Sequence, residues 1–282
     1  MNAAEIGIRP LRSVAECHAA AALQRDVWGG DYTDVVPATL LHVVDYVGGL
    51  AAGAFDESGE LLGFVFGVSG VRDGDLVHWS HMLGVRVSAR NLGLGRRLKE
   101  YQRDALRAIG VKRILWTFDP LMAKNAYFNL NRLGAKVVEY VPDMYGTSTS
   151  PLHLGMPTDR LIVRLETTMR EPELRPTEPR AAPVFTAFPR LNDVTASRDG
   201  TLPEHALIEI PAEVLETLAQ SPSSARTWRL AVRDYFQWAL AHGYVVTGVR
   251  RDAAANRSFY VLERQRAAAA TLTDSRELQR AR

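Results

Sequence analysis

Hydrophobic and polar positions along residues 1–166 predict short strands and helices in alternation. Branched and aromatic side chains crowd residues 48–70, around the polar turn DESGE, and residues 74–87, a pattern typical of strands. Over residues 91–109 the apolar positions recur at helical spacing, which predicts an amphipathic helix that ends at Gly110. The other predicted elements of this part are a strand at 6–11, a helix at 13–29 capped by Ser13, a strand at 111–118, a helix at 123–133, and strands at 135–141 and 160–167.

The pattern changes after residue 166 and predicts three further segments. Residues 167–204 are proline-rich and polar, which indicates a linker or an extended arm. Residues 205–264 form a small C-terminal α/β segment, and residues 265–282 a flexible tail. We expect the C-terminal segment to pack on the first part and to close the substrate side or a dimer interface. Its predicted elements are a strand at 206–210, a helix from Pro211 to Gln220, a longer helix capped by Ser223 or Ser224 that runs to Gly243, and a hairpin at 244–251 and 258–264.

Composition and charge narrow the classes of function. The 282 residues are 46% hydrophobic and 23% charged, which is ordinary for a soluble protein. The net charge of +2 favours neither nucleic acid nor an anionic membrane as a partner. No stretch has the length of a membrane-spanning helix, and we expect no signal peptide. The single cysteine, Cys17, excludes an internal disulfide and a cysteine-built zinc site, so we expect a cytoplasmic protein without a metal.

The strongest chemical signal is the stretch SARNLGLGRRLKEYQRDAL at residues 88–106, which places two glycines between a strand and a helix. Gly93 and Gly95 allow a ligand close to the backbone. The free N–H groups at the start of the following helix form an anion site. Positive charge is added by three arginines, Arg90, Arg96 and Arg97. The natural ligand is a phosphate or diphosphate; the alternative is a turn that needs glycine only for its geometry.

Two other phosphate-binding motifs do not match this loop. A dinucleotide-binding loop requires a third glycine, and Leu98 stands at that position. A Walker loop requires Gly-Lys-Ser/Thr after the glycines, and the sequence continues with two arginines instead.

The order of strand, R-x-x-G-x-G loop, long helix, buried strand and asparagine-bearing helix resembles the GNAT superfamily of acyl-CoA N-acyltransferases over about residues 5–165. HMLGVRVSARNLGLGRRL is similar to the family's acyl-CoA signature, and WTFDPL and NAYFNLNRLGA resemble a predicted acetyltransferase subgroup. The resemblance implies an α/β (α+β) fold with a mixed, mostly antiparallel central sheet flanked by helices. It also implies that strands 77–87 and 112–118 splay apart, with the pantetheine of the acyl-CoA in the gap.

The resemblance further implies a donor site along this strand and loop. The coenzyme A diphosphate would lie on the backbone N–H groups of residues 92–97, and an N–H group near Leu83 to Val85 would polarise the thioester carbonyl. The side chain of Asn125 would reach the pantetheine amides. The implied donor-binding residues are Leu83, Gly84, Val85, Arg90, Asn91, Leu92, Gly93, Leu94, Gly95, Arg96, Arg97 and Asn125.

Two histidines lie three residues apart on the strand at 74–87, so in a regular strand they face opposite sides. His81 matches the place of a histidine that works as a base in arylalkylamine N-acetyltransferases, and an imidazole titrates near neutral pH. We expect His81 to be the catalytic base, with a structural histidine as the alternative. For His78 we expect a structural role.

The acid that protonates the departing thiolate has two candidates. The family's usual tyrosine position is Leu130 here, and Tyr127 lies one turn earlier, with a core aromatic as its alternative role. Tyr145 in the stretch PDMYG is the second candidate, and water is a third source of the proton. Asp119 ends the buried strand, where it could bind the amine substrate or cap the turn at Pro120.

These expectations define an N-acetyltransferase. It would move an acyl group from acetyl-CoA or another acyl-CoA to the amine of a small molecule, by direct attack in a ternary complex. An alternative, motivated by Leu130, is an acyl-CoA-binding or regulatory module without turnover. A third is a structural protein in which the C-terminal segment dominates. We expect no nucleic-acid or membrane partner, and a homodimer is one option for the assembly.

Overall fold

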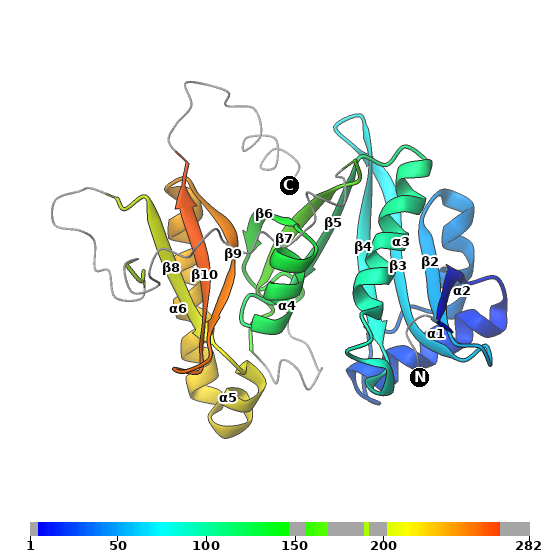
Figure 1. Cartoon of the computed structure of the whole chain (residues 1–282), viewed down its shortest axis with the longest axis horizontal. Coiled ribbons are helices and arrows are strands. Elements are labelled where there is room, and N and C mark those ends of the chain that lie inside the picture. Colours follow the sequence, from blue (N-terminus) through cyan, green and yellow to red (C-terminus); the bar gives the residue numbers. More distant parts are fainter. Residues whose placement is uncertain (1–4, 147–155, 169–188, 192–201, 266–282) are drawn as a thin grey trace.

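A computed structural model of the chain describes residues 5–146, 156–168, 189–191 and 202–265, and their central feature is a seven-stranded sheet (Figure 1). The strand order is β1-β2-β3-β4-β5-β7-β6, and every neighbouring pair is antiparallel except β4 and β5. Helices flank this sheet, so the mixed, mostly antiparallel fold class predicted from the sequence is confirmed. The strands are β1 Gly7–Pro10, β2 Leu50–Phe55, β3 Leu61–Arg72, β4 Asp75–Val85, β5 Arg113–Phe118, β6 Lys136–Val141 and β7 Arg160–Glu166.

The two parallel strands of this sheet pair over only three residues each. Val77 to Trp79 of β4 lie opposite Arg113 to Leu115 of β5. Beyond these pairs the strands diverge, and Figure 1 shows them meeting at one end and separating toward the other. The predicted splay between the strands is therefore present. It begins at Ser80 on β4 and at Trp116 on β5.

Helices α1 (Val14–Trp28) and α3 (Leu94–Ala108) cover opposite faces of the sheet. Alternating side chains of β3 show this arrangement, because Phe64 and Phe66 pack with α1, and Val65 packs with α3. Two segments that the sequence pattern did not predict, α2 (Ala38–Val43) and a 3-10 turn (Val44–Val47), add to the α1 side. Helix α4 (Ala123–Tyr127) continues as a π-helical turn, η4 (Phe128–Arg132).

The C-terminal residues form a three-stranded antiparallel sheet with two helices. The sheet order is β8-β10-β9, and one buried hydrophobic cluster joins this sheet and α6 to β5, β6 and β7. Tyr260 of β10, for example, donates a hydrogen bond to the Pro120 carbonyl at 2.7 Å. The C-terminal segment therefore shares its core with one end of the large sheet. The elements are β8 His205–Pro211, α5 Val214–Gln220, α6 Pro222–Ala241, β9 Tyr244–Asp252 and β10 Arg257–Arg264.

Several predicted element boundaries are wrong by a few residues. Helix α3 begins at Leu94 instead of residue 91, because Asn91 and Gly93 have positive φ angles of 68° and 74°. Pro211 ends β8 instead of opening a helix. Ser221, rather than Ser223 or Ser224, caps α6, and Pro222 occupies its first turn. The predicted linker and tail fall almost entirely outside the described residues.

Candidate active site

The glycine loop leads from β4 into α3, and its backbone fits a ligand that approaches closely. Gly93 caps the helix in a left-handed conformation without a side-chain hydrogen bond, so the first-turn N–H groups stay available. A Cβ atom on Gly95 would meet Phe128 at 3.5 Å and Leu83 at 3.6 Å, which are ordinary contacts. The chain's own packing therefore does not require glycine at 95, and the missing side chain leaves the backbone accessible.

The three arginines of the loop differ in how they are used. Arg90 is exposed beside the loop. Arg96 forms an ion pair with Glu100 at 2.6 Å, and Arg97 donates to the Ile6 carbonyl at 2.5 Å. Arg97 therefore holds α3 to the start of the sheet, and the role of the three arginines in binding a phosphate stays a prediction.

A β-bulge in β4 places His81. The register of β3 and β4 shifts between the pair Phe66–Met82 and the pair Gly67–Ser80, so His81 is the extra residue. The two histidines of β4 face opposite sides: His78 contacts Gln102 of α3, and the His81 ring lies edge-on to Phe66 at 6.1 Å. Loss of solvation lowers the pKa of His81, and the Asp34 carboxylate opposes that shift. Part of the residue is open to solvent, while the partial desolvation of the ring favours its neutral form.

Electrostatic interactions connect His81 to other polar side chains through Asp34, whose charge shifts the pKa of both His81 and Tyr32. The Tyr145 hydroxyl lies 3.1 Å from Thr117 Oγ1, and the Arg160 guanidinium lies 5.3 Å from the Tyr145 ring centre. Burial raises the pKa of Tyr32, as do the nearby charges of Asp34 and Tyr145. Of this group the sequence indicated only His81 and Tyr145. The others lack a local motif, since Tyr32 with Asp34, Thr117 and Arg160 come from three separate segments of the chain.

Asp119 is engaged by the C-terminal segment. Its two carboxylate oxygens accept hydrogen bonds from Arg229 of α6 at 2.7 and 2.6 Å, and Arg160 lies at 3.6 Å. Asp119 Oδ1 also accepts from the Leu121 N–H at 2.8 Å, which is the turn cap that was the alternative role. Its role as an amine-binding residue stays a prediction.

The residues expected on α4 lie toward solvent. Tyr127 is 43% exposed, so its alternative role as a core aromatic is wrong. Asn125 is also exposed, and Leu130 is buried at the family's usual tyrosine position. A residue that the sequence analysis missed is Asn129, which accepts a hydrogen bond from the Trp116 indole at 2.9 Å.

A buried polar network closes the narrow end of the gap on the α3 side. The Lys99 ammonium donates to Ser80 Oγ at 2.7 Å and lies 4.1 Å from the centre of the Trp116 ring. Gln102 joins Lys99 to His78, the latter at 3.1 Å. Burial lowers the pKa of Lys99 to about 7, and burial together with the Lys99 charge lowers that of His78 to about 3. His78 thus has the structural position that was expected.

Solved structures similar to this chain include several acetyltransferases. An acetyltransferase of the GNAT family from Streptococcus pneumoniae is 14% identical, with a TM-score of 0.47, over 57% of this chain and 99% of that one. Aminoglycoside 6'-N-acetyltransferase complexed with coenzyme A is 18% identical, with a TM-score of 0.44, over 58% and 98%. The NatC complex bound to Gag peptide and CoA is 16% identical, with a TM-score of 0.42, over 57% and 98%.

At these identities and TM-scores the likeness adds no weight to a functional argument. No protein-family model and no curated protein sequence matches the chain. The fold class therefore rests on the strand order and the splayed parallel pair. Within the described ranges, no helix is long and apolar enough to cross a membrane, and no group of three His, Cys, Asp or Glu side chains is placed to hold a metal ion.

Proposed function

We propose that this chain is a GNAT-type N-acetyltransferase that moves an acetyl group from acetyl-CoA to the amine of a small molecule. The observation that carries the proposal is the gap between β4 and β5, with the glycine loop at its wide end. Beyond Trp79 the backbone of β4 has no partner on the β5 side among the described residues. That edge offers a chain-like pantetheine the hydrogen bonds of an added strand.

The donor is held by backbone more than by side chains in this proposal. The first-turn N–H groups of α3, after Gly93, bind the diphosphate with the positive end of the helix dipole. Acetyl-CoA supplies the thioester. An N–H group at Leu83 to Val85 polarises its carbonyl, because these residues line the unpaired edge.

His81 acts as the base that neutralises the acceptor. The imidazole accepts a proton from the ammonium group, directly or through water, and the lowered pKa keeps it ready to do so at neutral pH. The amine nitrogen then attacks the carbonyl carbon, so that a C–N bond forms, the C–S bond breaks and the nitrogen gives up its surplus proton to solvent. The thiolate that leaves takes a proton from the Tyr145 hydroxyl, from Tyr127 or from water.

A direct test measures thiol release from acetyl-CoA over a panel of small amines, with His81→Gln beside the wild type. We expect kcat/KM to fall by about 10²–10⁴, as is typical for loss of a general base. His18→Gln is the matched control, because His18 is exposed on α1 and away from the gap. Undiminished turnover by His81→Gln, with a pH profile like that of the wild type, would show that His81 is not the base.

A second candidate is an acyl-CoA-binding module without turnover. Burial of Leu130 at the usual tyrosine position supports it, since no side chain at that site donates a proton. Saturable binding of coenzyme A in calorimetry, with no thiol release for any amine, would select the module. If Tyr145→Phe lowers kcat and the wild type shows turnover, the Tyr145 hydroxyl is the proton source and the module is excluded.

A further inference from the structure

Lys99 is a buried cation at the narrow end of the gap, and the chemistry proposed above does not use it. The residue is only 5% exposed, and its ammonium lies 4.1 Å from the centre of the Trp116 ring. Two of its three N–H groups donate to Ser80 Oγ and Gln102 Oε1, and the third has no hydrogen-bond acceptor among the described residues. Ser80 and Trp116 are the first residues of β4 and β5 beyond the parallel pairs. The ammonium therefore lies where the two strands part.

The two faces of the sheet carry different polar groups at the gap. Lys99 contacts Trp116 on the face that α3 covers. Thr117, the next residue of β5, points to the opposite face, where its hydroxyl lies 3.1 Å from that of Tyr145. His81 is also on that opposite face, because its ring packs against the cluster of α1. The expected base and Tyr145 thus share the α1 face, and Lys99 approaches the gap from the α3 face.

The length of pantetheine places its sulfur near Ser80 if the donor binds as proposed above, and the inference rests on that function. Between phosphate and sulfur the arm has about as many chain atoms as four residues of extended backbone, which is roughly 13 Å. Ser80 stands four residues before Gly84 on β4. Because α3 covers one face of the sheet and the diphosphate lies at its start, the arm reaches the gap from that face. The sulfur therefore lies on the side of Lys99.

We propose that the Lys99 ammonium is the acid that protonates the departing thiolate of coenzyme A. As the C–S bond breaks, the sulfur keeps the electron pair and takes a proton from Nζ, which becomes a neutral amine. Lys99 regains a proton from solvent once the thiol has left the gap. This residue supplies a proton on the face where the buried Leu130 has none to give.

The acidity of Lys99 is matched to this task. Burial lowers its pKa to about 7, whereas the pKa of an ordinary thiol is about 8.5. A proton therefore moves downhill from the ammonium to a thiolate. A proton donor with a pKa near the working pH is also the most effective one.

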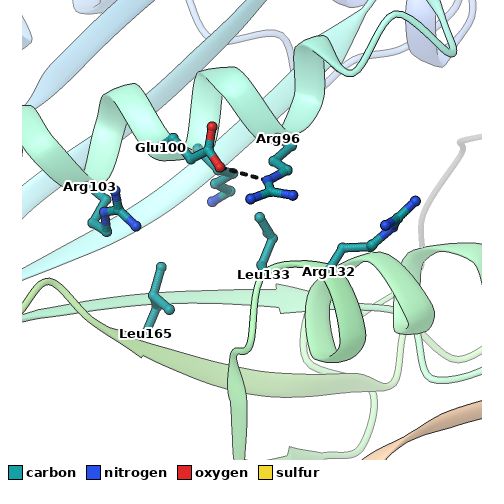
Figure 2. Close-up of a pocket in the computed structure, with 7 residues that line it drawn as sticks. Arg96, Glu100, Arg103, Arg132, Leu133 and Leu165 are labelled. Carbon is teal, nitrogen blue, oxygen red and sulfur yellow. Dashed lines mark hydrogen bonds and ion pairs between the residues drawn. The ribbon is translucent and has the colours of Figure 1, made fainter. Parts of the chain in front are cut away.

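The charged groups around Lys99 leave its proton free to move. Figure 2 shows Arg96 and Glu100 on the same helix paired with each other, at 2.6 Å, beside a small pocket that Lys99 also lines. Arg103 pairs with the residue that follows it, at 3.1 Å. His78 has a pKa of about 3 and is neutral. Among the described residues no carboxylate lies within ion-pair distance of the Lys99 ammonium, and burial alone shifts its pKa.

The first experiment locates the sulfur without requiring turnover. Ser80→Cys places a thiol where the serine hydroxyl meets Lys99 Nζ. With the disulfide of coenzyme A this thiol should form a mixed disulfide and release one coenzyme A thiolate, which mass spectrometry of the full chain detects. Desulfo-coenzyme A should block the reaction. Ser58→Cys, in an exposed turn, is the control and should react equally with and without desulfo-coenzyme A. The wild type gives the background from the buried Cys17.

The second experiment compares two leaving groups in Lys99→Met and the wild type. With acetyl-CoA, kcat should fall by about 10²–10⁴, as is typical for loss of a general acid. With the selenium analogue of acetyl-CoA, kcat should fall by less than about tenfold, because a selenolate is a weaker base and leaves without a proton. Lys136→Met, at an exposed position, should match the wild type with both donors. Near-ultraviolet circular dichroism checks the fold of Lys99→Met.

The outcomes separate this acid from the proposed function. If the wild type turns over, equal losses of kcat with the two donors in Lys99→Met would mean a structural role and would overturn the acid alone. Unchanged kcat in Lys99→Met would do the same, as would the absence of a mixed disulfide in Ser80→Cys. No thiol release by the wild type with any amine would overturn the proposed function and the acid together.

Discussion

The two sides of the β4–β5 gap are built in different ways. On the β4 side, the buried clusters draw only on residues between Ile6 and Leu98, so one continuous stretch of chain makes the glycine loop and its support. On the β5 side, one cluster runs from Leu106 to Leu262 and mixes the end of the large sheet with the C-terminal sheet. The buried core therefore divides at the gap, whereas the composition of the chain changes near residue 166.

Replacement of Arg229 should produce the largest change, a loss of stability. This loss should concern the β5 side of the gap alone. Its side chain is 1% exposed and pairs with Asp119, so Arg229→Ala leaves a buried carboxylate without this partner. We expect the free energy of unfolding to fall by about 3–5 kcal/mol. Chemical denaturation measures this loss, and coenzyme A affinity below the transition should be unchanged.

Arg226→Ala is the matched control for that experiment, because Arg226 is exposed on the same helix. It should cost less than about 0.5 kcal/mol. If Arg229→Ala and Arg226→Ala have the same free energy of unfolding, α6 does not stabilise the β5 side through Arg229. The two sides would then not differ in the way described above.

Gly95→Ala, on the β4 side of the gap, should show the opposite pattern: it should weaken coenzyme A binding without lowering the stability of the fold. A Cβ atom there meets only ordinary contacts, and alanine is the better helix former by about 1 kcal/mol, so stability should hold or rise. Coenzyme A should bind about 10–100-fold more weakly if the loop cradles its diphosphate, since a methyl group blocks the close approach. Calorimetry with Gly70→Ala as control, where a Cβ meets nothing within 4 Å, checks this. Unchanged affinity would show that the loop does not bind the coenzyme A diphosphate.

Lys99 contacts both sides of the gap, at Ser80 of β4 and Trp116 of β5. Its protonation should make the free energy of unfolding depend on pH. Burial lowers the pKa of Lys99 to about 7 in the folded state, against 10.5 ordinarily. Between these values the unfolded chain binds one more proton, so its contribution makes stability rise with pH by about 1 kcal/mol per pH unit. Lys99→Met should remove that slope, measured by denaturation at pH 7.5 and 8.5. Lys136→Met, at an exposed position, should keep it; a slope shared by all three proteins would refute the assignment.

Arg90→Gln should give the smallest effect. The side chain is exposed beside the loop, where solvent and salt screen its charge. We expect coenzyme A affinity to fall by about fivefold or less, and the difference to shrink as salt rises. A larger loss that persists at high salt would show that the Arg90 side chain, and not the backbone, carries the donor site.

The sequence predicted the β4 side better than the β5 side for a physical reason. The glycine loop is a local signal, because Gly93 and Gly95 stand beside the helix whose N–H groups they expose. The polar group connected to His81 through Asp34 is not local: Tyr32 and Arg160, which interact electrostatically, come from segments more than a hundred residues apart, and neither has a motif. Their proximity depends on the packing of whole elements, which periodicity does not encode.

Local sequence patterns also did not predict contacts that depend on an irregular helix or on residues far apart in the chain. The π-helical turn at Phe128–Arg132, which the sequence pattern did not indicate, carries Asn129, the acceptor of the hydrogen bond from the Trp116 indole. The Asp119–Arg229 pair joins positions 110 residues apart, so neither residue showed its partner in the sequence. The role of Asp119 as a turn cap, by contrast, followed from the neighbouring Pro120 alone.

The splay of β4 and β5 also bears on aggregation. An unpaired strand edge is ordinarily a surface on which another molecule can add its own strand. Here two edges that have no strand partner across the gap among the described residues begin at Ser80 and Trp116 and face each other. Each edge hinders the approach of a foreign strand to the other. The unpaired edge of β4 can thus remain accessible to an extended ligand without pairing with a strand of another copy of the chain.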